Sequence, residues 1–172
     1  MSLNAGMGYS YLMYLRGSEY TKISKKQEER IMIALGCDHG GFDMKQIVIE
    51  YLEEKGIAYK DFGCYDKNSC DYPHFGRAAA EAVASGECEK GIVVCTTGIG
   101  ISMVANKVKG VRCALCNDPF AAKMTRLHND ANVLALGGGM VGKNMALDIV
   151  ETFLNTEFSE GENHIRRIGL IE

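Results

Sequence analysis

The sequence lacks the features that mark membrane, secreted and nucleic-acid-binding proteins. No stretch approaches the roughly 20 consecutive apolar residues that a membrane-spanning helix needs. The short apolar run 9–15 has no basic residues before it and no small-residue cleavage site after it, so we expect no signal peptide. Lysine and arginine are scattered and the net charge is only -3, so no nucleic-acid partner is expected. These absences favour a cytoplasmic protein that has no membrane partner.

Two nucleotide-binding motifs are also missing. The chain has no Gly-Lys-Ser/Thr sequence, which excludes a Walker phosphate loop. The run Gly98-Ile99-Gly100 lacks the third glycine of a dinucleotide-binding loop and follows the third expected strand rather than the first. Neither an NTPase nor a dinucleotide-dependent enzyme is therefore indicated.

The seven cysteines are not expected to form disulfides. Cys95, Cys113 and Cys116 lie in or beside apolar runs that are typical of core strands, where a free thiol behaves as a small hydrophobe. Cys113 and Cys116 are three residues apart, so in a strand they point to opposite faces. No second C-x-x-C or His pair completes a zinc site. A thiol-redox protein built on Cys113 and Cys116 remains a distant alternative.

The chain divides near residue 30. Residues 1–30 show no helical or strand period and end in a charged run. We expect them to be a poorly ordered N-terminal extension or residues added in cloning, with a short helix as the alternative. Residues 31–172 are expected to form one domain with a C-terminal tail.

From residue 31 onward, strand-like and helix-like segments alternate. The expected strands are 31–35, 57–62, 91–95, 111–116 and 131–136, and the expected helices are 44–55, 73–85, 101–108, 119–128 and 141–154, with a short helix in the tail 159–172. This alternation predicts an α/β fold with a five-stranded parallel sheet covered by helices on both faces. Met44, Met103, Met124 and Met145 fit the apolar faces of these helices.

In such a sheet, ligands bind outside the carboxyl ends of the strands. The residues just past the expected strands are the polar and glycine-rich ones, at 37–41, 95–102, 117–118 and 137–139. Among them, Cys95 opens a loop with two threonines and two glycines that leads into a helix. Glycines let backbone amides approach an anion, and a helix start stabilises negative charge. Cys95 is therefore a candidate base or nucleophile, although a tight turn with a buried cysteine fits as well.

Other polar residues have structural explanations when taken singly. Asp38 could cap the helix near Gly41, and His128 could cap the end of its own helix. The basic group His164, Arg166 and Arg167 could be a solvated cluster or could bind phosphate.

Taken together, these residues fall into five segments in one order, namely 36–42, 71–74, 95–102, 105–107 and 128–134. In that order and spacing the chain resembles type B ribose-5-phosphate isomerase and the wider family with galactose-6-phosphate and allose-6-phosphate isomerases. The resemblance extends from about Met32 to Ile168. It implies a Rossmann-like three-layer sandwich, and a homodimer or dimer of dimers with active sites at the subunit interface. It also implies aldose–ketose isomerisation through an enediolate, with no metal and no organic cofactor.

The resemblance also implies roles for individual residues. Cys95 resembles the base that moves a proton between C1 and C2, and Thr97 resembles the hydroxyl that positions the substrate. The backbone amides of Thr96, Thr97, Gly98, Ile99 and Gly100 resemble the pocket for the enediolate oxygen.

Further from the base, His128 and Asp38 resemble the pair that opens the sugar ring, and Asn129 resembles a residue that holds the enediolate. Tyr72 resembles a wall of the sugar site. His39 and Arg167 resemble phosphate ligands.

Three positions depart from the family pattern. Thr96 replaces a glycine, Gly139 stands where many members have arginine, and Asn163-His164 stands where many have Arg-His. Arg167, with Arg166 or Lys143, would then bind the phosphate. Ribose 5-phosphate is the expected substrate. A six-carbon aldose 6-phosphate (allose or galactose 6-phosphate) and a non-catalytic sugar-phosphate-binding subunit are the alternatives.

Overall fold

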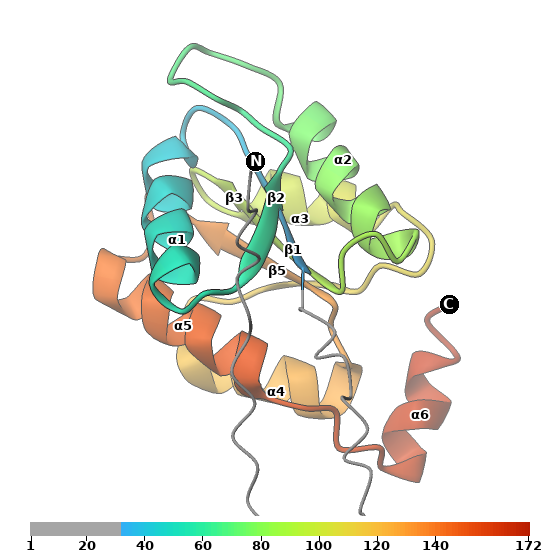
Figure 1. The fold of residues 1–172 in the computed structure, drawn as a ribbon. Coiled ribbons are helices and arrows are strands. Elements are labelled where there is room, and N and C mark those ends of the chain that lie inside the picture. Colours follow the sequence, from blue (N-terminus) through green and yellow to red (C-terminus); the bar gives the residue numbers. More distant parts are fainter. Residues whose placement is uncertain (1–31) are drawn as a thin grey trace, which may run out of the picture.

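The computed structural model describes residues 32–172, so the expectation for residues 1–30 lies outside the described part of the chain. Strands and helices alternate along it as the sequence predicts (Figure 1). The strands are β1 (Met32–Cys37), β2 (Ala58–Asp61), β3 (Lys90–Cys95), β4 (Cys113–Leu115) and β5 (Val133–Gly137), and the helices are α1 (Phe42–Glu54), α2 (Tyr72–Ala84), α3 (Ile99–Ala105), α4 (Pro119–Asn129), α5 (Lys143–Asn155) and α6 (Glu162–Ile168).

The five strands form one parallel sheet in the order β2-β1-β3-β5-β4, which confirms the expected sheet. The main difference from the expected boundaries is at the edge strand β4, which is shorter than 111–116. The carbonyl of Arg112 accepts from the amide of Val133 in β5 at 3.3 Å, but its own amide donates to the side-chain oxygen of Asn132 at 2.9 Å, so the strand pairing stops here.

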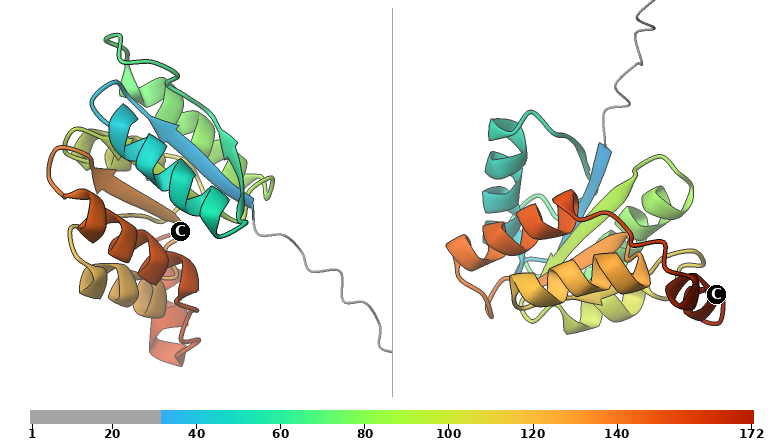
Figure 2. Two further views of the ribbon diagram at one scale, coloured as in Figure 1. Left: turned by 60° about the vertical axis from the view of Figure 1, so that its left-hand side comes forward. Right: turned by 90° about the horizontal axis from the view of Figure 1, so that it is seen from below.

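Helices cover both faces of the sheet, which confirms the Rossmann-like three-layer arrangement (Figures 1 and 2). Helices α1, α4 and α5 lie on one face and α2 and α3 on the other. Consecutive strand residues point to opposite faces. Large side chains such as Ile33, Leu134 and Phe153 fill the first face, whereas small ones such as Ala79 and Ala135 dominate the second.

The expected tail helix is present as α6, which lies apart from the two helical layers near the end of α4 (Figure 2). It has no buried residue. An ion pair between Arg112 and Glu172, with 2.6 Å between nitrogen and oxygen, fixes the C-terminal end of the tail. Within the described residues, no helix is long and apolar enough to cross a membrane.

Two methionines expected on apolar helix faces are exposed. Met103 on α3 is 61% exposed and Met145 on α5 is 44% exposed, whereas Met44 is buried. The helical period places them beside apolar residues, but no element within residues 32–172 covers them. Ile99, one turn before Met103, is also exposed, so α3 presents an apolar outer side.

Candidate functional site

The chain order reverses between the neighbouring strands β1 and β3, and the site lies outside their carboxyl ends. Cys37 pairs with Val94 in the register, so the next residues, Asp38 and Cys95, stand side by side. Adjacent strands are about 4.8 Å apart, and paired positions point to the same face of the sheet. Asp38 and Cys95 are therefore neighbours at the carboxyl edge of the sheet.

Cys95 ends β3 and is only 5% exposed. The amide of Gly98 donates a hydrogen bond to its sulfur at 3.1 Å. Gly98 has a φ of +75°, and a side chain there would collide with Leu115 and come within 2.9 Å of the backbone of Leu136. Only glycine fits this left-handed, crowded position. The turn therefore directs a backbone donor at the thiol, an arrangement that stabilises negative charge on sulfur.

The neighbouring threonine hydroxyl belongs to the same turn. The amide of Ile99 donates to Thr97 Oγ1 at 3.3 Å, which leaves the Thr97 hydroxyl proton available for a ligand. The amides of Gly98 and Ile99 thus have partners inside the loop. Of the five amides expected to form an oxyanion pocket, those of Thr96, Thr97 and Gly100 remain the better candidates.

Asp38 is buried and well fixed. Its own amide donates to the carbonyl of Val94 at 3.2 Å, and its carboxylate accepts from the amide of Gly41 at 2.9 Å. Asp38 does not cap α1, whose N-cap is Gly41 and has no side-chain cap hydrogen bond; its carboxylate instead holds the turn before the helix.

His39 is exposed, and a distant loop fixes its ring. The amide of Cys70 donates to His39 Nδ1 at 3.2 Å, so in the neutral ring the proton resides on Nε2. Nε2 is therefore a donor suited to an anionic ligand. The contribution of Cys70 could not be predicted from the sequence, because 31 residues separate it from His39 and no local pattern marks a backbone donor.

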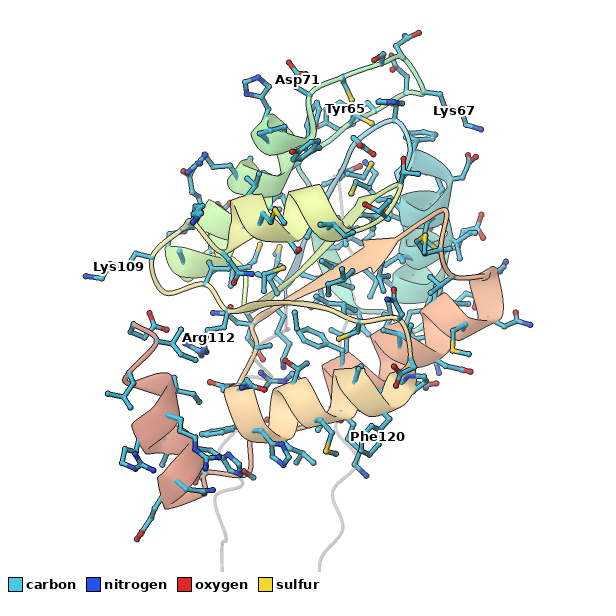
Figure 3. All side chains as sticks on the ribbon, turned by 180° about the vertical axis from the view of Figure 1, so that it is seen from behind. Tyr65, Lys67, Asp71, Lys109, Arg112 and Phe120 are labelled. Carbon is cyan, nitrogen blue, oxygen red and sulfur yellow. The ribbon has the colours of Figure 1, made fainter. Side chains whose placement is uncertain are left out.

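Lys45 anchors the loop that follows β2, and this role could not be predicted from the sequence either. Its side chain is 1% exposed. Its ammonium group donates to both carboxylate oxygens of Asp61 at 2.7 Å and to the carbonyl of Cys64 at 2.6 Å. All three donors of the ammonium group are satisfied. Tyr65 and Asp71 lie further along this loop, at its outer edge (Figure 3).

Tyr72 begins α2 and lies against the glycine loop. A side chain added at Gly100 would come within 2.8 Å of the Tyr72 ring, so the ring rests on the backbone of Gly100. Tyr72 is 37% exposed. The ring therefore lies beside the loop that Cys95 opens, where a wall of a sugar site is expected.

A second group of expected site residues lies at the opposite end of the sheet. Helix α4 runs antiparallel to the strands and carries His128 and Asn129 about 15 Å back from its start. Figure 3 shows the course of α4, with Phe120 labelled where α4 starts and Arg112 labelled where β4 starts. One chain therefore brings Asp38, His39, Tyr72 and Cys95 together, but separates them from His128 and Asn129.

Helix α6 meets this second group. The rings of His128 and His164 are stacked, with centroids 4.5 Å apart and planes inclined by 13°. Partial desolvation, followed by the charges of His128 and Arg167, lowers the pKa of His164. Arg167 is exposed one turn beyond His164, so the expected phosphate ligands Arg167 and His39 also lie at opposite ends of the sheet within one chain.

The remaining cysteines are poor candidates for chemistry. All seven thiols are free. Cys113 and Cys116 pack into opposite faces of the sheet, as expected. Burial raises the pKa of both thiols, that of Cys116 to about 11. Burial, together with the Cys64 sulfur 3.7 Å away, also raises the pKa of Cys37 to about 12. Within residues 32–172, no three His, Cys, Asp or Glu side chains are placed to bind a metal ion.

Known proteins of one family match this fold and site. A family model described as Ribose/Galactose Isomerase matches residues 33–171. Ribose-5-phosphate isomerase B of Escherichia coli (strain K12) is 43% identical over 139 residues, which are 81% of this chain and 93% of that protein. The galactose-6-phosphate isomerase subunit LacB of Clostridium acetobutylicum is 44% identical over 128 residues, or 74% of each chain.

A solved structure agrees with these matches. That of Clostridium thermocellum ribose-5-phosphate isomerase B has 50% sequence identity and a TM-score of 0.81, and the match covers 82% of this chain and 95% of that one. Fold, sequence and the order of the motifs thus agree with the resemblance expected from the sequence. The chain belongs to the ribose/galactose isomerase family of sugar-phosphate isomerases.

Proposed function

We propose that this protein interconverts ribose 5-phosphate and ribulose 5-phosphate through an enediolate, with Cys95 as the base. The observation that carries the proposal is the buried sulfur of Cys95, which accepts a backbone hydrogen bond in a glycine turn at the switch point of the sheet. The relatives named ribose-5-phosphate isomerase B support the choice of substrate.

Cys95 removes the proton from C2 of the open-chain aldose and returns it to C1. A carbon acid next to a carbonyl is too weak for a thiolate unless the developing oxyanion is stabilised, and preorganised amides contribute several kcal/mol to that stabilisation. The amides of Thr96, Thr97 and Gly100 serve this purpose, and the hydroxyl of Thr97 positions the substrate beside the sulfur.

Ring opening and phosphate binding use the residues around this centre. His128 and Asp38 move protons at the ring oxygen and the anomeric hydroxyl, and Asn129 holds the enediolate. His39 donates from Nε2 to the phosphate, since the amide of Cys70 occupies Nδ1. Arg167 supplies the positive charge at the same phosphate.

This assignment needs two copies of the chain. Cys95 and His128 lie at opposite ends of one sheet, so a site that holds both takes His128, Asn129 and Arg167 from a second copy. The exposed apolar side of α3, with Ile99 and Met103, and the unburied helix α6 flank the two half-sites and offer surface for such contact. We therefore propose a homodimer with two shared sites.

The direct test of Cys95 is the variant Cys95→Ala. It should lose turnover of ribose 5-phosphate while retaining the fold and sugar-phosphate binding, measured by circular dichroism and calorimetry. Turnover close to that of the wild type would exclude Cys95 as the base.

The shared site has a separate test by mixing two inactive variants, Cys95→Ala and His128→Asn. Random exchange makes half of the dimers mixed, and each mixed dimer has one intact site of two. About a quarter of the wild-type activity should therefore return. As the control, each variant is put through the same mixing procedure alone. If activity stays at the level of the parents although exchange is demonstrated by mass spectrometry, each site lies within one chain.

A six-carbon aldose 6-phosphate is the second candidate substrate, favoured by the identity of 44% to a galactose-6-phosphate isomerase subunit. Comparing kcat/KM for five- and six-carbon aldose phosphates decides between them. The same relative is described as a subunit, so a non-catalytic role in a hetero-oligomer is the third candidate. Sugar-phosphate binding without turnover by the purified chain would favour it.

A further inference from the structure

The loops that follow three neighbouring strands meet at Thr96. This residue directly follows Cys95 and is exposed. The carbonyl of Cys95 accepts from the amide of Gly138 at 2.8 Å, and the carbonyl of Thr96 accepts from the amide of Gly139 at 2.9 Å. Two consecutive hydrogen bonds thus join the loop after β3 to the loop after β5.

The side chain of Thr96 fills the space between two glycines. A side chain built on Gly40, in the loop after β1, would collide with Thr96 Oγ1 and lie 3.2 Å from its Cβ. A side chain built on Gly139 would lie 3.2 Å from Thr96 Cγ2. The hydroxyl therefore rests on Gly40 and the methyl group on Gly139, so one side chain spans the gap from the loop after β1 to the loop after β5.

Thr96 also lies between the two points that fix a substrate in the function proposed above. On one side is the sulfur of Cys95, to which Thr96 is joined through the backbone. On the other is Gly40, the chain neighbour of the phosphate ligand His39. A sugar phosphate with its phosphate at His39 and its carbonyl carbons at Cys95 must pass Thr96. One additional carbon between these two fixed points bulges against the threonine side chain.

We propose that Thr96 is a specificity-determining residue whose side chain disfavours six-carbon relative to five-carbon aldose phosphates. The proposal rests on the isomerase function proposed above. Discrimination by a single carbon in a rigid pocket amounts to about 10- to 200-fold. Since Thr96 is partly open to solvent, its contribution belongs at the lower end of that range.

The test compares kcat/KM for ribose 5-phosphate and allose 6-phosphate in four proteins. Thr96→Ala removes the hydroxyl and methyl groups but keeps the Cβ and the backbone restraint, and should shift the ratio about tenfold toward the six-carbon sugar. Thr96→Gly should shift the ratio at least as far. Thr96→Val retains the shape and serves as the matched control, with a ratio within about threefold of the wild type. A general loosening of the loop changes kcat/KM for both substrates alike, so its effect cancels in the ratio.

Two outcomes would overturn the proposal. One is a ratio in Thr96→Ala and Thr96→Gly within about twofold of the wild type. The other is a shift in Thr96→Val as large as that in Thr96→Ala, which would assign the effect to the hydroxyl group instead of to size. If the wild type turns over neither sugar, the isomerase function fails, and the ratio of dissociation constants measured by calorimetry replaces kcat/KM. The same tenfold shift in binding is then expected for Thr96→Ala, and its absence refutes the steric role.

Discussion

Replacing Lys45 by methionine removes the only cationic partner that the described residues give to Asp61, and should lower the free energy of unfolding by about 3 kcal/mol. Removing one member of a buried ion pair costs about 3–5 kcal/mol, because the other charge is left without compensation. Here Asp61 remains 21% exposed and keeps a hydrogen bond from the amide of Gly63, which reduces the loss. The carbonyl of Cys64 also loses its strong donor and keeps only the thiol of Cys37 at 3.9 Å, which costs about 1–3 kcal/mol, and the buried methionine side chain offsets part of this.

Urea denaturation followed by circular dichroism at one fixed protein concentration measures this change, since subunit association would otherwise shift the midpoint. In thermal unfolding, about 3 kcal/mol corresponds to a fall of roughly 6–12 °C for a chain of this size. The matched control is Lys55→Met, whose partner Glu151 lies at 3.4 Å with both side chains 50% exposed. That change should cost less than about 1 kcal/mol.

A double-mutant cycle isolates the ion pair itself. Asp61→Asn should be strongly destabilising alone, because the ammonium group of Lys45 is then buried without a counter-charge, and much less so in the Lys45→Met background. If Lys45→Met costs no more than Lys55→Met, or if the two changes at Lys45 and Asp61 are additive, the buried pair does not hold this loop.

Three further predictions address the glycine turn, the second half-site and the thiols. Gly98→Ala should cost more than about 2 kcal/mol of stability and abolish activity, because it adds a collision to an unfavourable φ. The control Gly110→Ala, with φ +81° and open space around it, should cost only the backbone strain of about 1–2 kcal/mol. Equal losses of stability in denaturation would contradict the packing argument. In an NMR titration the pKa of His164 should lie below its usual range and rise in His128→Gln, because desolvation is partly relieved and one positive charge is removed, and an unchanged value would disprove the coupling. Mass spectrometry after iodoacetamide treatment at mildly alkaline pH should find Cys37 and Cys116 unlabelled in the native protein, because burial raises their pKa to about 12 and about 11. Both thiols should be labelled after unfolding. Labelling in the native protein would show that these thiols are accessible.

The sheet and its helices could be predicted because they follow from local patterns. Apolar runs of five or six residues alternate with helical periods, and glycine or proline separates them, so the order of strands and helices and even the tail helix are correct. The boundaries that differ depend on tertiary contacts. Strand β4 is short because the side chain of Asn132, 20 residues away, takes the amide of Arg112. No property of residues 111–112 alone reveals this.

The site was predictable in part for the same reason. Asp38 and Cys95 follow strand ends, and parallel strands bring such ends to one edge. No pattern within α1 marks Lys45 as buried, since its partners Asp61 and Cys64 lie later in the chain. The distance between Cys95 and His128 depends on the direction of α4, which only the topology gives.

The unequal side-chain sizes on the two faces of the sheet have a consequence for how this protein tolerates mutation. Beside α1 and α5, large side chains such as Ile33 and Leu134 pack together. When one of them is replaced, its neighbours can repack so that the total core volume is kept. Beside α2, alanines such as Ala79 and Ala80 set the spacing, so any enlargement lifts the helix that carries Tyr72 at its start. In a library of random substitutions, enlargements on the alanine side should therefore reduce catalysis before they reduce folding, whereas changes on the other side should reduce both together.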